Sequence, residues 1–199
     1  MGKVVVIEHV TLDGVMQAPG RPEEDDRDGF EHGGWAHARV DEVMGRVMGK
    51  GMARGGAMLF GRRAYEDFFS FWPSQGDNPF TEVLENRQKY VASRTLTEPL
   101  PWRNSTLLDG DAAEAVAKLK EEPEDLGVLG SGQLVRSLVQ QGLVDEFVLM
   151  IHPLLLGTGR RLFADGGAFA ELRLTDTTTT TTGVVITKYQ AGAVSGADV

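Results

Sequence analysis

The stretch LGVLGSGQLVRSLVQQGLVDEFVLMIHPLLLGTGRRLF, residues 126–163, carries the strongest structural signal in the chain. Its first residues, Leu126–Leu129, form a short apolar run that is typical of a buried strand. A glycine turn at 130–132 follows. A helix is predicted next, because apolar residues recur on one face at a 3.6-residue period: Leu134, Val135, Leu138, Val139 and Leu143. The apolar run Phe147–Ile151 then predicts a second strand.

The turn Gly130-Ser131-Gly132 has two interpretations. Ser131 or Gly132 can cap the start of the helix, and Gly142 can take positive φ after its end. The unpaired N–H groups and the dipole of a helix N-terminus favour an anion, so the turn is either a phosphate cradle or a plain strand-to-helix joint. It is not a dinucleotide-binding Rossmann fingerprint, because Val135 replaces the third glycine and the turn lies late in the chain.

Composition limits the class of protein. At 199 residues the chain suits one domain, and 41% apolar with 25% charged residues is ordinary for a globular fold. The absence of cysteine excludes disulfides and thiolate zinc sites, and we expect no metal. A net charge of −9 argues against a nucleic-acid partner. Because no apolar run approaches 18 residues and no charged-then-apolar leader is present, we expect a cytoplasmic protein without a membrane span.

Strands and helices alternate along the rest of the chain. Apolar or β-branched runs predict strands at Lys3–Val10, Ala57–Phe60, Lys89–Ser93 and Ser105–Leu108. Helices are expected over His37–Arg54, after Gly61, after the cap residue Asn78, and from Asp111 to about Glu122. Thr177–Thr182 and Val184–Tyr189 predict a terminal hairpin. The pattern predicts an α/β fold with a mixed, mostly parallel sheet in a single domain over residues 1–190, followed by a frayed tail at 191–199.

The segment Gln17–Trp35 is rich in proline, glycine and acids, which predicts a long mobile loop with little buried area. Its acid run from Glu23 to Asp28 is expected to be a solvated face. Phe30, His32 and Trp35 are better candidates for lining a substrate pocket, and Glu31 lies among them. We expect the loop to close over the substrate side of the site.

Three turns follow predicted parallel strands: Gly61-Arg62-Arg63, Ser93-Arg94-Thr95 and Gly130-Ser131-Gly132. Ligands of open α/β sheets bind outside the carboxyl ends of the strands, where these turns would meet. Each turn offers hydroxyl, guanidinium or backbone N–H groups, which are the groups that hold a phosphate. Their convergence therefore predicts an anion site.

Five motifs together resemble the dihydrofolate-reductase-like family, in the branch of the riboflavin-biosynthesis reductase domain, known as the RibD C-terminal domain. They are TLDG (Thr11–Gly14), FGRRAYEDF (Phe60–Phe68), VASRTL (Val91–Leu96), GSGQLVRSLVQQGLVDE (Gly130–Glu146) and HPLLLGTGRRLF (His152–Phe163). The resemblance implies a three-layer α/β/α fold, NADPH as cofactor and a small-molecule substrate.

The resemblance also implies roles for individual residues. Gly61, Arg62 and Arg63 would meet the cofactor phosphates, and Ser93, Arg94 and Thr95 would surround the adenosine 2′-phosphate. The pyrophosphate would lie at a helix N-terminus made by Gly130, Ser131, Gly132, Gln133 and Leu134. Val10, Met16 and Leu129 would contact the nicotinamide. Ala64 stands where the family often has threonine.

The leading functional hypothesis is an NADPH-dependent reductase that transfers hydride to a small pterin- or aminopyrimidine-like heterocycle. An alternative is the riboflavin-pathway 5-amino-6-(5-phosphoribosylamino)uracil reductase, although Ile7 and Leu129 stand where those enzymes tend to carry Lys and Glu. A nucleotide-binding module or redox sensor without turnover is a further alternative. A nearby acid or water would supply the proton. The candidate acids are Glu8, Asp13, Glu31 and His32, and Asp13 can instead stabilise its own turn.

The segment VDEFVLMIHPLLLG, residues 144–157, is more apolar than a sheet edge should expose. We therefore expect a homodimer, and the resemblance implies pairing through the same region.

Overall fold

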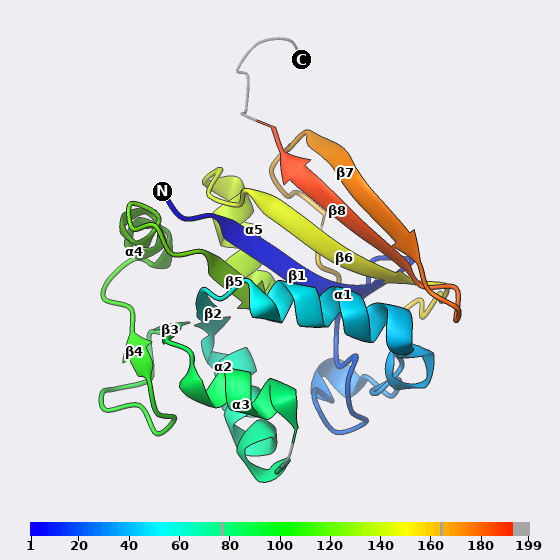
Figure 1. Cartoon of the computed structure of the whole chain (residues 1–199), viewed down its shortest axis with the longest axis horizontal. Coiled ribbons are helices and arrows are strands. Elements are labelled where there is room, and N and C mark those ends of the chain that lie inside the picture. Colours follow the sequence, from blue (N-terminus) through cyan, green and yellow to red (C-terminus); the bar gives the residue numbers. More distant parts are fainter. Residues whose placement is uncertain (77, 164, 193–199) are drawn as a thin grey trace.

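The computed structural model describes residues 1–76, 78–163 and 165–192. One eight-stranded sheet has the order β4-β3-β2-β5-β1-β6-β8-β7 (Figure 1). Its strands are β1 (Val4–Thr11), β2 (Ala57–Gly61), β3 (Lys89–Ala92), β4 (Ser105–Leu107), β5 (Leu126–Leu129), β6 (Glu146–His152), β7 (Leu172–Thr179) and β8 (Val185–Ala191). The strands from β4 to β6 in this order are parallel, whereas β8 is antiparallel to both of its neighbours.

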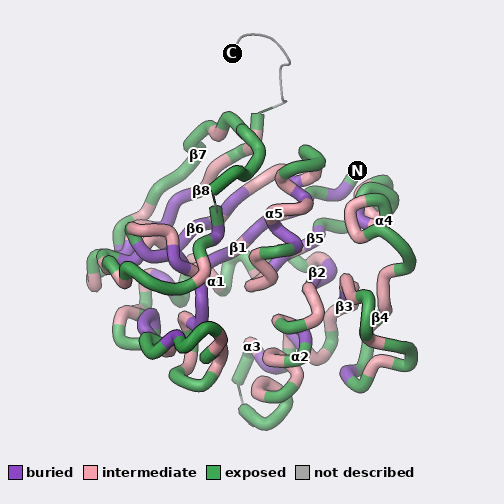
Figure 2. The backbone as a smooth tube through the Cα atoms, turned by 180° about the vertical axis from the view of Figure 1, so that it is seen from behind, coloured by how far each residue is buried: buried purple, intermediate pink, exposed green. Residues whose placement is uncertain are grey.

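Helices cover both faces of the sheet. They are α1 (Glu42–Ala53), α2 (Arg62–Phe71), α3 (Pro79–Asn86), α4 (Ala112–Leu119) and α5 (Gly132–Gln140), with short 3-10 turns at Arg27–Gly29, His37–Arg39 and Trp72–Ser74. Figure 1 shows α1 in front of the sheet, and Figure 2, seen from behind, brings α4 and α5 to the front. The expected three-layer α/β/α fold with a terminal antiparallel hairpin is confirmed.

Side chains alternate between the two faces along each strand, which explains why helices pack on both faces of the sheet. On one face, Val6 of β1 and its neighbour Val128 of β5 pack with Val135 and Leu138 of α5. On the other face, Met44 of α1 packs against the sheet residues Met150 and Ile186. The same face carries a second cluster, in which α2 and α3 cover β2 and β3: Phe60, Tyr65, Leu84, Val91 and Trp102.

Two of the predicted helices have different bounds in the structure. The helix expected over His37–Arg54 is wrong in its first part, because α1 begins only at Glu42 after the separate 3-10 turn. Asp41 causes the break, since its side chain caps the N–H of Met44 at 2.9 Å and also accepts hydrogen bonds from Thr181. Helix α4 ends at Leu119 rather than near Glu122.

The terminal hairpin is confirmed in β7 and β8, with a register shift between Leu174 and Asp176. The tail predicted at 191–199 starts too early, because Ala191 belongs to β8 and the N–H of Gly192 donates to the carbonyl of Glu171 at 2.9 Å. Residues 193–199 lie outside the described residues. Among the described helices, none combines the length and the apolar character needed to cross a membrane.

The apolar segment 144–157 is not a sheet edge. Strand β6 lies between β1 and β8, and Phe147, Leu149 and Met150 are buried. The hydrophobicity of its strand β6 belongs to the core, so the argument from an exposed sheet edge is wrong, whereas Leu155 after the strand is exposed. The edge strands are β4 and β7, and Figure 2 shows β7 largely exposed.

Candidate functional site

The topology opens a crevice at the carboxyl edge of the sheet. Strand β5 is followed by α5 on one face, whereas its neighbours β2 and β1 are followed by segments that cover the other face. Ligands of open α/β sheets bind where neighbouring connections diverge in this way. A cleft of about 830 Å³ lies at this edge of the protein.

The three predicted anion-binding turns come together in this cleft. The N–H of Gly61 donates to the Ser131 hydroxyl at 2.9 Å, which joins the turn after β2 to the turn after β5. A Cβ on Gly130 would lie 3.3 Å from the Cβ of Ala64, and Gly130 has φ of 60°, so this position favours glycine. All predicted turn residues line the cleft: Gly61, Arg62, Arg63, Ser93, Arg94, Thr95, Gly130, Ser131, Gly132, Gln133 and Leu134.

Three helices start in the cleft, α2, α4 and α5, and two of them, α2 and α5, have no side-chain cap. Asp41, Asn78 and Asp111 cap α1, α3 and α4, whereas α2 and α5 begin at Gly61 and Ser131 without a capping hydrogen bond. The Ser131 hydroxyl is used elsewhere, because it also donates to the carbonyl of Leu129 at 3.2 Å. Both helix N-termini therefore keep unpaired N–H groups and a positive dipole end beside each other, as an anion requires.

Arginines add full positive charges to the same end. Arg62 pairs with Glu66 at 3.1 Å, whereas Arg63 and Arg94 have no carboxylate partner within residues 1–76, 78–163 and 165–192. The Ser93 hydroxyl accepts hydrogen bonds from the N–H groups of Thr95 and Leu96 at 3.1 and 3.0 Å, which folds its turn tightly. This end of the cleft can hold several phosphate groups.

The loop after β1 forms the opposite wall. Its centre is the buried side chain of Gln17, which donates to the carbonyls of Asp25 and Arg27 at 3.2 and 3.1 Å and accepts from the N–H of Arg160 at 3.0 Å. Met16 packs over the start of α5, and an added Cβ on Gly132 would lie 2.5 Å from its sulfur. No sequence pattern singled out Gln17, because two of its partners are backbone carbonyls of an irregular loop and the third, Arg160, lies 143 residues away.

The prediction that the Gln17–Trp35 loop buries little area is wrong. Phe30 and Trp35 are buried in a cluster with Val15, Ala18 and Ala36. The Trp35 indole N–H donates to the Gln17 carbonyl at 2.7 Å, and its ring meets His152 edge to face. These aromatic residues fill a small core rather than line the cleft.

The expected acidic surface is also partly wrong. Burial raises the pKa of Glu24. Burial also raises the pKa of Asp67 on α2, which pairs with Arg21 of the loop. Asp25 is only partly buried; burial acts to raise its pKa, but its hydrogen bonds with Arg27 outweigh that effect and lower it. Glu24, Asp25 and Asp67 line the cleft, and the sequence did not single them out.

None of the proposed acids lines the cleft. Asp13 accepts from the Thr11 hydroxyl at 2.6 Å and from the Gly157 N–H at 2.8 Å, and these bonds lower its pKa and fix its turn. Glu31 and His32 are exposed at the surface. Glu8 is buried, and burial followed by the charge of Glu24 raises its pKa well above the usual range.

Of the three residues expected to contact the nicotinamide, only Met16 lines the cleft. Val10 is buried in the core under α5, and Leu129 packs with the α2 cluster. The alternation along β1 places Glu8 on the same face as Val10, towards α5. Its neighbour His9 points to the other face, where its Nδ1 lies 2.9 Å from Nε2 of His152.

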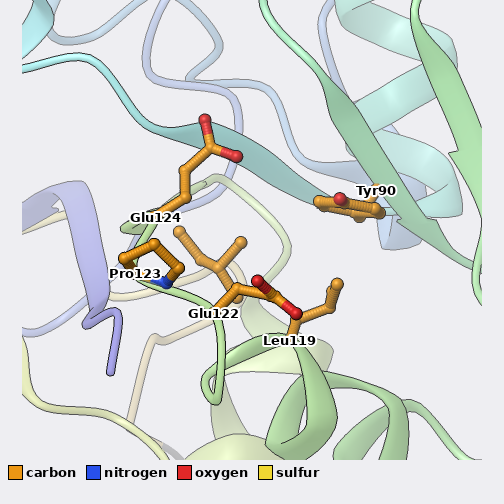
Figure 3. Close-up of a pocket in the computed structure, with 6 residues that line it drawn as sticks. Tyr90, Leu119, Glu122, Pro123 and Glu124 are labelled. Carbon is orange, nitrogen blue, oxygen red and sulfur yellow. The ribbon is translucent and has the colours of Figure 1, made fainter.

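A second cavity, of about 540 Å³, lies at the amino ends of β3 and β5 (Figure 3). Tyr90, Leu119, Pro123 and the carboxylates of Glu122 and Glu124 surround it. It has no basic residue in its lining and does not suit an anion. In the described ranges, no group of three His, Asp or Glu side chains is placed to hold a metal ion.

Comparisons with known proteins agree with this fold. The family model described as the RibD C-terminal domain matches residues 2–186. The Bacillus subtilis (strain 168) protein YyaP, described as uncharacterized, is 34% identical over 138 residues, covering 66% of this chain and 72% of its own. YwjB of the same organism, also described as uncharacterized, is 24% identical over 136 residues, which cover 56% of this chain and 78% of YwjB.

Solved structures share the architecture. A proposed riboflavin biosynthesis protein from Shewanella sp. PV-4 has a TM-score of 0.71 at 21% identity, covering 96% of this chain and 99% of its own. A pyrimidine reductase-like protein from Corynebacterium diphtheriae has a TM-score of 0.64 at 12% identity, and the match covers 96% of this chain and 92% of that protein. Acinetobacter baumannii RibD has a TM-score of 0.62 at 14% identity, and this chain spans 58% of it. The chain belongs to the RibD C-terminal domain family.

Proposed function

We propose that this protein is an NADPH-dependent reductase that transfers hydride to a small, flat, pterin- or aminopyrimidine-like heterocycle. The observation that carries the proposal is the pair of uncapped helix N-termini, α2 and α5, joined by the hydrogen bond between Gly61 and Ser131. A family of reductase domains and a cleft of about 830 Å³ at the same place support it.

The residues of the cleft fit an extended dinucleotide. The sheet order places the turns after β3, β2 and β5 side by side and then the segment after β1. Ser93 and Arg94 would hold the adenosine 2′-phosphate, and the N-termini of α2 and α5 would hold the pyrophosphate. When bound, NADPH supplies the hydride.

The protein's own contribution is orientation and exclusion of water. Met16 covers the start of α5, and the Gln17 hydrogen bonds hold the loop as a wall of the cleft. Asp13 is used in its turn, Glu31 and His32 lie on the surface, and Glu8 points to the face under α5. We therefore infer that water in the cleft supplies the proton.

Replacing Arg94 tests the cofactor assignment. Charge-assisted hydrogen bonds contribute about 1.5–3 kcal/mol each, so Arg94→Ala should weaken NADPH binding by about 10- to 100-fold. NADH lacks the 2′-phosphate, and its Kd should change less than about twofold. Calorimetric titration of both cofactors measures the difference.

Arg46→Ala is the matched control, because Arg46 is an exposed arginine of α1 outside the cleft. It should leave both affinities unchanged. Equal losses for NADPH and NADH in Arg94→Ala would reject the assignment.

Turnover separates the reductase from its alternatives. Full-length protein should consume NADPH, followed at its absorption band, with at least one member of a panel of pterins, pyrimidines and quinones. Binding of NADPH without consumption across the panel would favour a nucleotide-binding module or redox sensor. Consumption restricted to the phosphoribosylamino-uracil substrate would favour the riboflavin-pathway reductase.

A further inference from the structure

The sheet order turns distant segments of sequence into a row that carries a gradient of charge. Along the carboxyl edge, the turns after β3, β2 and β5 are followed by the segment after β1, which begins at Met16. Neighbouring strands lie about 4.8 Å apart, so these positions are continuous. Arg63 and Arg94 mark the β3–β2 end, with no carboxylate partner in the part of the chain that the structure describes.

At the other end of the row, the guanidinium groups of Arg27 and Arg160 are paired with carboxylates, although the buried Nε of Arg160 has no hydrogen-bond partner in the described ranges. Arg27 donates from Nε to Asp25 at 2.5 Å and from a second nitrogen to the other oxygen of the same carboxylate. Arg160 pairs with Asp28 at 2.7 Å. Each pair satisfies a positive charge that a phosphate would otherwise use.

The same neutralisation ties the loop to α2. Arg21 pairs with Asp67 and lies 4.0 Å from the centre of the Phe71 ring. The ion pair with Asp67 neutralises the guanidinium group of Arg21, on the loop that forms this wall of the cleft. An anion that paired with the charge of Arg21, Arg27 or Arg160 would have to compete with a carboxylate already bound there. Arg136 of α5 also lines the cleft and has no carboxylate partner in the described ranges.

Carboxyl groups are in excess at this end. Glu24 accepts backbone N–H bonds from Gly20 and Arg21 at 2.7 and 3.0 Å and has no ion pair within residues 1–76, 78–163 and 165–192. Asp26 also lines the cleft without an ion pair in those ranges. An anion placed among these groups would lose hydration and meet like charges.

We propose that the substrate end of the cleft, between Met16 and Asp67, takes a neutral or cationic flat heterocycle that carries no phosphate group. This inference rests on the proposed function, because it names the substrate class for the same cleft. It separates this protein from a reductase whose substrate is a sugar phosphate.

Riboflavin and its 5′-phosphate, FMN, form a matched pair of probes, because they share one flat ring system and differ only in the phosphate. Full-length protein saturated with NADP⁺ should bind riboflavin at least tenfold more tightly than FMN in calorimetric titrations. FMN that binds as tightly as riboflavin, or more tightly, would overturn the proposal.

A variant that removes one carboxylate charge tests whether the ion pairs cause the preference for a ligand without phosphate. Asp25→Asn releases Arg27 from its ion pair, so the ratio of the affinity for FMN to that for riboflavin should rise about three- to tenfold. Glu42→Gln is the matched control, because it releases Arg46 from an exposed pair on α1 with a distance of 3.7 Å. A variant Asp25→Asn with the wild-type preference would contradict the proposal.

If neither riboflavin nor FMN binds, a titration with inorganic pyrophosphate tests whether the loop end of the cleft accepts an anion. The NADP⁺-saturated protein should show no saturable second site for pyrophosphate, and finding one at the loop end would overturn the proposal. NADP⁺ binding is measured first. If NADP⁺ does not bind, the proposed function fails, and the flavin titrations on the free protein still test the charge preference.

Discussion

Glu8 is the buried acid of β1, and its Oε1 has no hydrogen-bond partner in the described ranges. It lies between Val6 and Val10 on the face of β1 that α5 covers. Burial is the main reason that its pKa is raised well above the usual value, and the nearby Glu24 adds to the effect. The native protein therefore holds a proton on Glu8 at a pH where the unfolded chain has released it.

Glu8→Gln should stabilise the protein increasingly as pH rises. Below about pH 4.5 both forms are neutral and equally stable. Above that pH the wild type loses stability relative to the variant by about 1.4 kcal/mol per pH unit until the native carboxyl ionises. Urea unfolding from pH 5 to 8 measures the gap, with Glu31→Gln at the surface as control. Parallel pH curves would contradict the assignment.

At the scale of the element, the helices divide by how they begin. The sequence supplies Asp41, Asn78 and Asp111 as caps for α1, α3 and α4, and it supplies glycine and an engaged serine for α2 and α5. Ser131 has φ of 64°, a left-handed conformation that is uncommon outside glycine. Of the three helices that start at the cleft, α2 and α5 lack a local cap and leave their N–H groups to a ligand, whereas Asp111 caps α4.

The loop after β1 is an element with its own small core. Trp35→Ala removes the packing of a buried ring and its hydrogen bond to Gln17, so it should lower the free energy of unfolding by about 3–5 kcal/mol. Denaturant unfolding measures this loss. Val40→Ala is the control, because Val40 is 57% exposed in the next turn. An unchanged unfolding midpoint with impaired turnover would restore the idea of a mobile lid.

At the scale of the whole molecule, exposed apolar side chains follow β6 rather than form it. Leu155 and Phe169 are 75% and 77% exposed, and Phe163 is half exposed with its ring against Phe147. All three residues lie between β6 and β7 in the sequence, and exposed apolar side chains that form one contiguous patch mark protein interfaces. We therefore still propose a homodimer, now through the connection between β6 and β7.

Light scattering at micromolar concentration should give the mass of two chains. The double variant Leu155→Glu with Phe169→Glu should shift the mass to one chain, because it places charges in the proposed interface. Val40→Glu is a control of similar exposure, at 57%. A single-chain mass for the wild type would refute the dimer.

The sequence by itself determined the repeated units of this fold. Strand β5, its glycine turn and α5 depend on residues within one stretch, because helical periodicity, capping and positive φ are properties of near neighbours. The convergence of the turns at Gly61, Ser93 and Gly130 could also be predicted, since parallel strands end at one edge.

Only the tertiary structure decided what those residues meet. Trp35 is buried because His152, distant in sequence, lies beneath it, and Asp67 belongs to the cleft because Arg21 reaches it from the loop. The acid run looks solvated when it is read in order, yet Asp25 and Glu24 become cleft walls. Burial and ion pairing depend on partners that sequence order does not place together, so the charge gradient of the cleft emerged only when the chain was folded.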